Sequence, residues 1–219
     1  MWPLMAIFSA HQGAHVDIQV IEEQVALNPT RVELQYDLAL AAWRAGDVER
    51  SRALVSANRA SPDWPVDAVW LEAMLAKSMG QHHEAEILLL HHLQHPDARQ
   101  SAYSELAETV RIQGRFREAG AHYRRAAQET LDPDDVIWSA KMAAKIGEYD
   151  VALRRLDWGL AFLGQAVSLR EARVHILNDS GNSEAALRAL DDLLELAPRH
   201  QGWTTLRLAI EAENKKVMR

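Results

Sequence analysis

The sequence has no cysteine and no long run of basic or apolar residues. Without cysteine the chain can hold no disulfide, thiolate zinc site or thiol nucleophile. Lys and Arg never occur more than two in a row, and the formal net charge is −7 with a pI near 5.8. That charge excludes the basic surface typical of nucleic-acid binding and the polybasic segment of a membrane anchor. We therefore expect no nucleic-acid partner and no membrane insertion.

Residues 1–14 form an apolar N-terminal segment, and the first basic side chain is that of Arg31. A signal peptide would begin with basic residues, and Phe8 departs from the small residue expected before cleavage after Ala10. The segment is also too short to span a bilayer. Two interpretations stay open: a remnant of a targeting signal, or an apolar cover for the first helix. The compartment is open between exported and cytoplasmic, with the absence of cysteine favouring export.

Glycine recurs through the chain at intervals of 34, 34, 33 and 34 residues. The five positions are Gly46, Gly80, Gly114, Gly147 and Gly181. A helical pattern precedes and follows each glycine, which is typical of an array of helix–turn–helix repeats. One such unit cannot bury its apolar face alone, so the units must stack against one another. The hydrophobic content of 48% is enough for a continuous core.

At three offsets from the repeat glycine, the side chains have a similar size in every repeat. Seven residues before it stand Ala39, Ala73, Ala107, Ala140 and Val174. Five residues after it stand Ser51, Ala85, Ala119, Ala152 and Ala186. Nine residues after it stand Val55, Leu89, Tyr123, Leu156 and Leu190. Small side chains let two helices cross closely and large ones fill the space between pairs, so we predict these positions in the core.

Prolines set the repeat boundaries. Pro62, Pro96 and Pro198 follow their glycines by 16 or 17 residues and end the second helix, whereas Pro133 begins a helix capped by Asp132. We predict one solenoid over residues 15–215. Its parts are a half repeat 15–31, repeats 32–65, 66–99, 100–132, 133–166 and 167–200, and a closing helix 201–215.

Over residues 15–215 the pattern resembles the tetratricopeptide repeat (TPR), especially in the short bacterial TPR proteins. The segments 114–119 and 147–152 match it best, while Gln35, Arg170 and His92 depart from it. The resemblance implies an all-α fold, a right-handed α-solenoid of TPR-like helix–turn–helix repeats with a C-terminal closing helix. It also implies that the first helices line a concave groove that binds a peptide or helix of another protein.

The groove positions carried over from the family lie ten, six and three residues before each glycine, on one helix stripe. They include Tyr36, Leu40, Trp43, Trp70, Met74, Lys77, Glu108, Arg111, Ile137, Lys141, Glu171, His175 and Asn178. The early members would form an exposed apolar patch and the later ones a charged channel. The basic residue and asparagine that clamp a chaperone tail in some family members are missing, which disfavours that partner. Trp138, Trp158 and Trp203 are predicted to pack in the core or between repeats.

Metal binding and catalysis have little support. His91 and His95 are four residues apart on a helix, with Glu84 or Asp97 as further ligands, but we favour solvated histidines with His92 in a packing position. No catalytic motif occurs, and His122, Ser139 and Ser183 lack a local activating partner. We therefore predict neither metal, cofactor nor enzyme activity.

Two classes of function remain. The first is a protein–protein interaction scaffold or adaptor that binds a partner peptide or helix, in a bacterial envelope or secretion assembly. The second is a self-associating structural module, such as a homodimer, whose groove is filled by its own N-terminus or by another copy. Molecular mass at two concentrations separates them, because only self-association depends on concentration.

Overall fold

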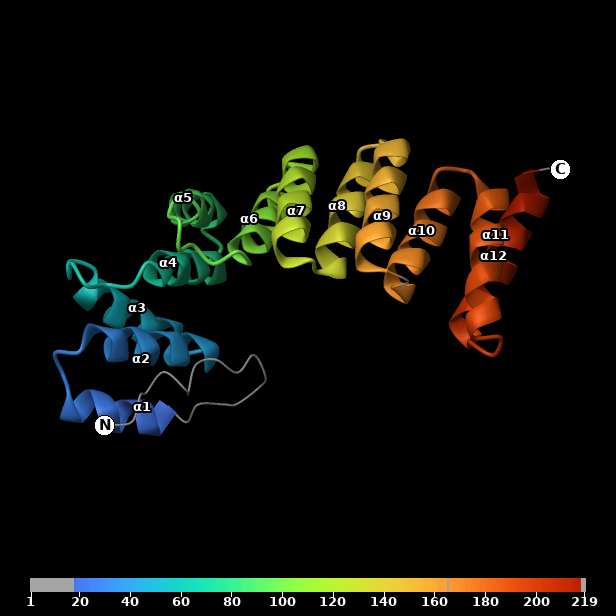
Figure 1. The fold of residues 1–219 in the computed structure, drawn as a ribbon. Helices are drawn as coiled ribbons and strands as arrows, with labels where there is room; N and C mark the ends of the chain where they lie inside the picture. The colour runs from blue at the N-terminus through green and yellow to red at the C-terminus, as the bar shows by residue number, and fades with distance from the viewer. Residues whose placement is uncertain (1–17, 165, 218–219) are drawn as a thin grey trace. The chain divides into compact units, whose positions relative to one another are not determined.

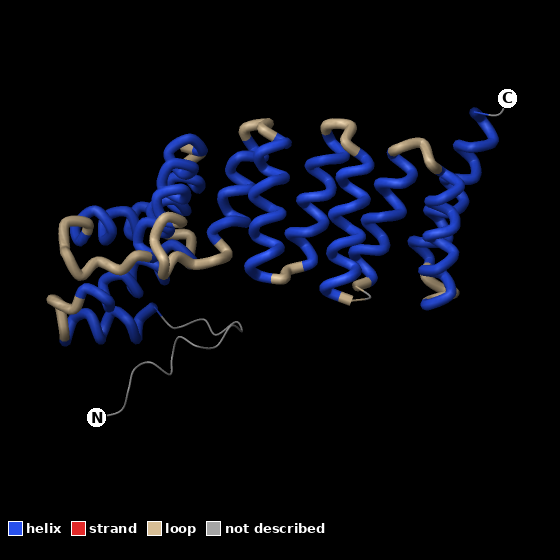
Figure 2. The backbone as a smooth tube through the Cα atoms, turned by 45° about the horizontal axis from the view of Figure 1, so that its top comes forward, coloured by secondary structure: helices blue, strands red, loops and turns tan. Residues whose placement is uncertain are grey.

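The computed structural model describes residues 18–164 and 166–217. Over this part of the chain the structure has twelve helices and no strand, joined by short loops (Figure 2). The chain divides into two compact units, Met1–Gln81 and His82–Arg219, and each is described by itself. The single solenoid over residues 15–215 therefore stays a prediction. The apolar segment 1–14 lies outside the described residues.

The first unit contains four helices: α1 (Ile18–Leu27), α2 (Val32–Arg44), α3 (Val48–Asn58) and α4 (Asp67–Ser78). Each packs against the next along the chain, and α2 also contacts α4. Helices α2 and α3 are the two helices of the predicted repeat 32–65. Helix α1 falls in the half repeat 15–31.

The second unit contains eight helices: α5 (His82–His92), α6 (Ala102–Ile112), α7 (Phe116–Thr130), α8 (Pro133–Lys145), α9 (Tyr149–Leu163), α10 (Val167–Asp179), α11 (Ser183–Leu196) and α12 (Gln201–Val217). Figure 1 shows α6 to α12 side by side in chain order. Helix α8 contacts α10 as well as α7 and α9, so the first helices of successive repeats are neighbours. Helix α12 packs on α11, where the sequence predicts the closing helix.

Each repeat glycine ends a first helix in the same way. Gly46 has φ +83°, its N–H donates to the Trp43 carbonyl at 2.9 Å, and the Asp47 N–H donates to the Ala42 carbonyl at 2.9 Å. These two bonds form a Schellman motif, which needs the left-handed backbone that glycine adopts without strain. The other four repeat glycines have φ between +75° and +80°. The spacing of the glycines therefore reflects a backbone requirement repeated at each turn.

Burial confirms the three offsets. All ten small positions are fully buried, and the five large positions are buried too. Ser51 shows how the small positions meet, because its hydroxyl donates to the backbone carbonyl of Ala39 at 2.7 Å. The prediction for Pro133 is confirmed: α8 begins at Pro133, and the Asp132 carboxylate accepts from the Asp134 N–H at 2.9 Å. Helices α3 and α5 end at Asn58 and His92, four residues before Pro62 and Pro96, so these prolines follow the helix ends and do not set them.

The helices of the second unit bury their inner faces in a core that runs between repeats. One cluster joins Val136 and Ile137 of α8 to Leu156 of α9 and to Leu169 and Ile176 of α10. A second cluster carries the C-terminal part of the unit, where Trp203 of α12 packs with residues of α10 and α11. This core fixes the first helices α6, α8 and α10, which carry the later half of the predicted stripe.

Candidate functional site

The most elaborate part of the stripe lies where α6 meets α8. The guanidinium of Arg111 donates two hydrogen bonds to the Glu108 carboxylate, both at 2.6 Å, and the Tyr123 hydroxyl of α7 donates to the same carboxylate at 2.8 Å. Glu108 therefore holds both a cation and an aromatic ring in fixed positions. Charge-assisted pairs of this bidentate kind are among the stronger hydrogen bonds in proteins.

Trp138 completes this cluster. Its indole stacks on the Tyr123 ring with centroids 6.0 Å apart, and Arg111 lies over it at 5.3 Å. The Lys141 ammonium lies over it at 4.9 Å. We call these five residues (Glu108, Arg111, Tyr123, Trp138 and Lys141) the tryptophan cluster. Both cations sit at distances typical of cation–π interaction.

Trp138 packs between repeats, one of the two places predicted for it, because it stacks on Tyr123 of α7, yet 37% of its surface stays exposed. Its neighbour in sequence, Ile137, takes the buried place instead, with 8% exposure. The predicted stripe omits Trp138, because it contains only positions ten, six and three residues before each glycine, and Trp138 lies nine residues before Gly147. The available signal was the i, i+3 spacing of Trp138 and Lys141, which places them on one helix face.

Burial and the Glu108 hydrogen bond raise the pKa of Tyr123 above its ordinary value. The Glu108 hydrogen bonds likewise raise the pKa of Arg111. Near neutral pH, Tyr123 is thus a neutral donor and Arg111 a fixed cation. Lys141 differs, because within the described residues it makes no ion pair, only the contact with Trp138. The cluster consequently presents a partly exposed indole and one ammonium group that pairs with no carboxylate of the described residues.

The remaining stripe members of the second unit have separate surroundings. Glu171 accepts a hydrogen bond from the Trp203 indole of the closing helix, so it anchors α12. Asn178 accepts from the Ser183 hydroxyl at 3.5 Å, and His175 is exposed. The stripe is therefore not a uniform charged channel: its open part is the tryptophan cluster, and towards α10 it is partly used by internal contacts.

In the first unit the structure corrects the predicted apolar patch. Tyr36, Leu40, Trp70 and Met74 are buried, with Trp70 only 6% exposed, so they do not form an exposed surface. Trp43 is half-buried and meets Trp70 edge to face at 5.6 Å, and its indole N–H donates to the Ser78 hydroxyl at 3.4 Å. Large apolar side chains gain free energy from burial, which explains their place in the core.

The histidine cluster of α5 is divided by burial. His92 is 1% exposed, and its Nε2 accepts from the backbone N–H of Arg99 at 3.1 Å, which confirms its packing position. His91 and His95 are exposed, and the His95 Nδ1 accepts from the Asp97 backbone N–H at 3.1 Å. Over residues 18–164 and 166–217 no group of three or more histidines or carboxylates could hold a metal ion.

The buried polar groups of α8 have structural partners. The Ser139 hydroxyl donates to the Gly120 carbonyl at 2.9 Å, and Asp135 accepts from the Ser104 hydroxyl at 2.8 Å. Burial raises the pKa of Asp135 and lowers that of His122. These bonds tie α8 to α7 and α6, so Ser139 and Asp135 serve the packing of the repeats. None of the helices that the structure describes has the length and apolar character needed to cross a membrane.

Comparison with known proteins gives matches in structure alone. No protein-family model matches the chain, and no curated protein matches its sequence. YrrB, described as a TPR protein with an unusual peptide-binding site, matches with a TM-score of 0.65 and 14% identity, over 87% of this chain and 98% of its own.

Two further crystal structures are similar to this chain. The C-terminal part of a TPR repeat-containing protein from Cytophaga hutchinsonii has a TM-score of 0.71 and 12% identity, over 83% of this chain and 73% of its own. A tetratricopeptide repeat protein from Parabacteroides merdae has a TM-score of 0.60 and 13% identity, over 90% of this chain and 79% of its own. Together with the repeated glycine turns and the buried small positions, these likenesses show that the chain has the fold of the tetratricopeptide repeat proteins.

Proposed function

We propose that this protein is a protein–protein interaction module that binds a segment of a partner protein along the stripe of its first helices. The fold supports this, because proteins of the same fold include one described by its peptide-binding site. The setting of the partner in a bacterial envelope or secretion assembly is part of the proposal and rests on the sequence resemblance alone.

The observation that carries the proposal is the tryptophan cluster. A partly exposed tryptophan held between two cations and a tyrosine is costly to leave in water, and tryptophan, tyrosine and arginine are the residues enriched at binding hot spots. Glu108 fixes Arg111 and Tyr123 beforehand, so little conformational entropy is lost when a partner binds. The cluster fits a partner segment with an apolar or aromatic side chain for Trp138 and a carboxylate for Lys141.

The other stripe members of the second unit belong to the proposed surface in different ways. His175 is exposed and extends the stripe along α10, while Ile137, Glu171 and Asn178 fix its shape from below. The first unit carries its own part of the predicted stripe, and Trp43 and Lys77 are its partly exposed members. Tyr36, Leu40, Trp70 and Met74 would act through their neighbours, as Trp70 does by supporting Trp43.

A peptide selection tests the proposal. Random 16-residue peptides displayed on phage are selected on the immobilised full chain, and the enriched peptides are titrated against variants. We expect Trp138→Ala to lose about thirtyfold in affinity, equivalent to roughly 2 kcal/mol. Lys141→Glu should mainly slow association and change its salt dependence, since a charge at a rim affects encounter most.

Leu208→Ala is the control, because Leu208 is a large apolar residue that is 62% exposed and lies on α12, outside the stripe. Its affinity for the selected peptides should equal that of the parent. Selected peptides that bind Trp138→Ala as tightly as the parent would remove the cluster from the proposal. Sedimentation at two concentrations covers the alternative: a mass that rises with concentration and falls again in Trp138→Ala identifies a second copy as the occupant.

A further inference from the structure

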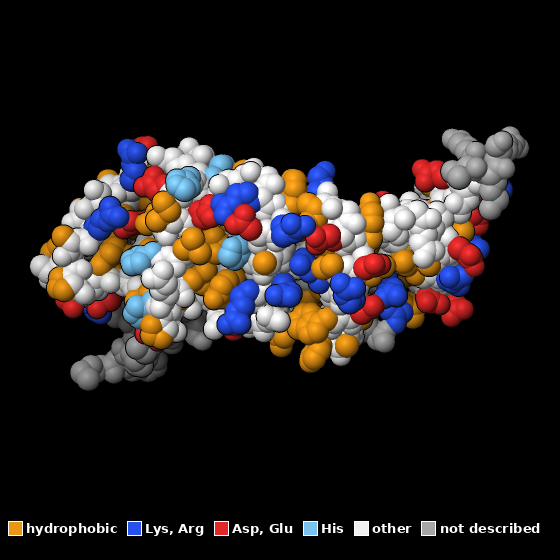
Figure 3. All heavy atoms as spheres, turned by 90° about the horizontal axis from the view of Figure 1, so that it is seen from above, with side chains coloured by type: hydrophobic (Ala, Val, Ile, Leu, Met, Phe, Trp, Pro, Cys, Tyr) orange, Lys and Arg blue, Asp and Glu red, His pale blue; other side chains and the backbone are white. Residues whose placement is uncertain are grey.

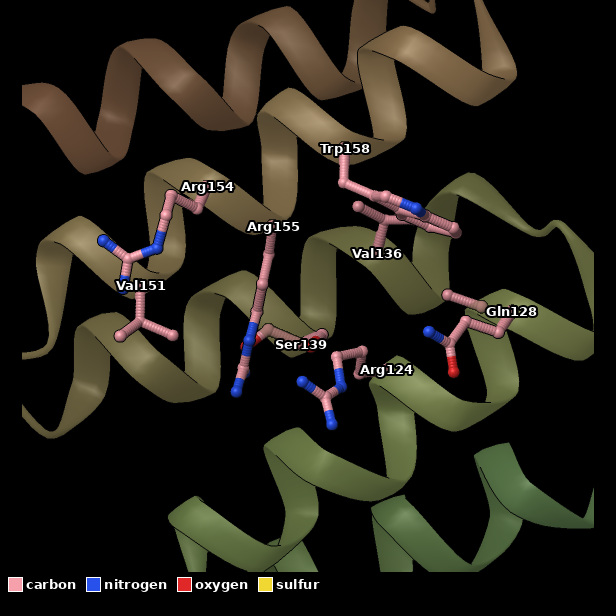
Figure 4. Close-up of a pocket in the computed structure, with 9 residues that line it drawn as sticks. Arg124, Gln128, Val136, Ser139, Val151, Arg154, Arg155 and Trp158 are labelled. Carbon is pink, nitrogen blue, oxygen red and sulfur yellow. The ribbon is translucent and has the colours of Figure 1, made fainter.

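A cavity of about 360 Å³ opens on the other side of α8 from the tryptophan cluster. Its walls come from α7 and α9, the second helices of two successive repeats, and α8 forms its floor (Figure 4). The polar and aromatic residues that line it are Arg124, Gln128, Ser139, Arg154, Arg155 and Trp158. None of them belongs to the predicted stripe.

The cavity concentrates positive charge without a matching acid. Three arginines line it, and no lining residue is a carboxylate. Among the residues that the structure describes, none of Arg124, Arg154 and Arg155 makes an ion pair. Their neighbours on α7 behave differently: Arg125 pairs with Glu129, and Arg117 pairs with Glu148 at 2.5 Å. Three arginines without an ion pair to a described residue are thus gathered around one cavity.

Arg155 is held in place by the backbone. Its Nη1 donates to the Ser139 carbonyl at 2.6 Å, while in Figure 4 the guanidinium of Arg124 lies beside it. Burial and the charge of Arg124 lower the pKa of Arg155, and the acid acting in the opposite direction is Glu148, already paired with Arg117. Two like charges in a partly desolvated site repel each other, and an anion between them removes that cost.

The space beside the arginines is apolar. The Trp158 indole and the side chain of Val136 line it, and the ring of Phe162 lies 5.2 Å from that of Trp158. Over this middle part of the second unit, Figure 3 shows Lys and Arg side chains next to exposed hydrophobic ones. A volume of this size lies in the range of small-molecule sites. A bare inorganic ion fills only a fraction of it, since one water occupies roughly 30 Å³.

We infer that this cavity is a second binding site, for an organic anion whose carboxylate or phosphate meets Arg124 and Arg155 and whose apolar or aromatic body lies against Trp158. Guanidinium groups match both kinds of anionic oxygen with paired hydrogen bonds. The Gln128 amide at the rim adds a donor. Such an anion is either a free small molecule or the C-terminal carboxylate of a peptide with an apolar last residue.

Ligand-observed NMR and calorimetry on the full chain test the site with four probes: 3-phenylpropionate, phenyl phosphate, inorganic phosphate and the neutral 3-phenylpropanol. We expect at least one aryl anion to bind about tenfold or more tightly than both inorganic phosphate and the alcohol. Equal binding of the alcohol would overturn the role of the arginines. Equal binding of inorganic phosphate would overturn the role of the apolar wall.

Charge-removing variants assign the binding to the cavity. Arg124→Gln and Arg155→Gln should each weaken the bound aryl anion by about tenfold, because each removes a charge-assisted contact. Arg125→Gln is the matched control, with the same change one residue along α7 outside the cavity, and should bind like the parent. Arg124 is exposed, so its variant tests the site even where Arg155→Gln disturbs folding. Unchanged affinity in Arg124→Gln would refute the site.

A last arm distinguishes the two sources. A short peptide ending in a free phenylalanine carboxylate is compared with its C-terminal amide on the Trp138→Ala variant, in which the proposed stripe is disabled. Tighter binding of the free acid, lost in Arg124→Gln, identifies a peptide terminus. Binding of the aryl acids without either peptide identifies a small molecule. Because the cavity and the stripe use different faces of α8, failure of either site leaves the other untouched.

Discussion

Gly159→Ala should destabilise the protein, although alanine normally stabilises a helix. Gly159 lies inside α9, where glycine costs about 1 kcal/mol relative to alanine. A Cβ built there would lie 2.7 Å from Cγ1 of Val136 and 3.2 Å from Cδ1 of Leu169. Carbon atoms prefer a separation of about 3.5–4.0 Å, so a methyl group must push α8 and α10 outward.

The magnitude follows from two opposing effects. Overpacking a well-filled core costs about 1–3 kcal/mol, and Val136 and Leu169 are both buried. Subtracting the gain of about 1 kcal/mol in helix propensity leaves a net loss of about 1 kcal/mol. Chemical unfolding of the full chain, followed by circular dichroism, measures it. Gly202→Ala is the control, because Gly202 is exposed near the start of α12 and a Cβ there would meet only the His200 side chain, at 3.2 Å from its Cε1, so stability should change by under about 0.5 kcal/mol.

A second-site variant makes the reasoning refutable. Val136→Ala alone should cost about 2 kcal/mol by leaving a cavity. In the double variant the new methyl group at position 159 occupies part of that space. The double variant should therefore lose about 1 kcal/mol less stability than the sum of the losses of the two single variants. Additive losses, or a Gly159→Ala protein more stable than the parent, would show that α8 and α9 do not approach as closely as the structure has them.

Three further predictions concern other parts of the chain. Ala119→Leu, at a fully buried small position, should lower stability by about 1–3 kcal/mol, whereas Arg117→Leu on the exposed face should change it by under about 0.5 kcal/mol, both measured by chemical unfolding. Neither added chelator nor the double substitution His91→Gln, His95→Gln should change the melting temperature of the untagged protein. A structural metal would contribute folding free energy, so a melting temperature lowered by chelator would contradict this prediction. Burial, together with the nearby Glu33 carboxylate, raises the pKa of Asp37 to about 6 from an ordinary value of 3.8. Between pH 4 and 6 the folded state therefore binds a proton that the unfolded state has lost. Stability should fall by about 1 kcal/mol as pH rises through this window, a figure that allows for the partial exposure of Asp37. Asp37→Asn should remove that fall.

The fold was predictable because its constraints are local. A Schellman turn at Gly46 needs a positive φ, and a helix crossing at Ala39 and Ser51 needs small side chains. Both requirements recur at each repeat, so a period near 34 residues carries them into the sequence. Gly159 shows where a local rule misleads: from sequence it suggests flexibility, yet it is buried between α8 and α10. Its role depends on side chains from two other helices.

The binding surface was less predictable, because consecutive residues of a helix point their side chains in directions about 100° apart. The family offsets place Ile137 on the stripe, but Ile137 packs in the core with Ala172 and Ile176 of α10. Trp138, one position later, stays 37% exposed, with Tyr123 of α7 and Arg111 of α6 against its ring. The exposure of a first-helix residue thus depends on the neighbouring first helix, which offsets counted within a single repeat do not contain.

The arginine cavity shows the same limit for charge. In the sequence, Arg124 and Arg125 are adjacent and alike, as are Arg154 and Arg155. Folding separates them: Arg125 reaches Glu129 one turn later, while Arg124 faces the space between α7 and α9. The net charge of −7 gives no sign of this cavity, since the acids that outnumber the bases lie elsewhere. A cationic site in an acidic chain arises when stacked second helices turn their basic side chains towards one gap, and only the packed structure contains that gap.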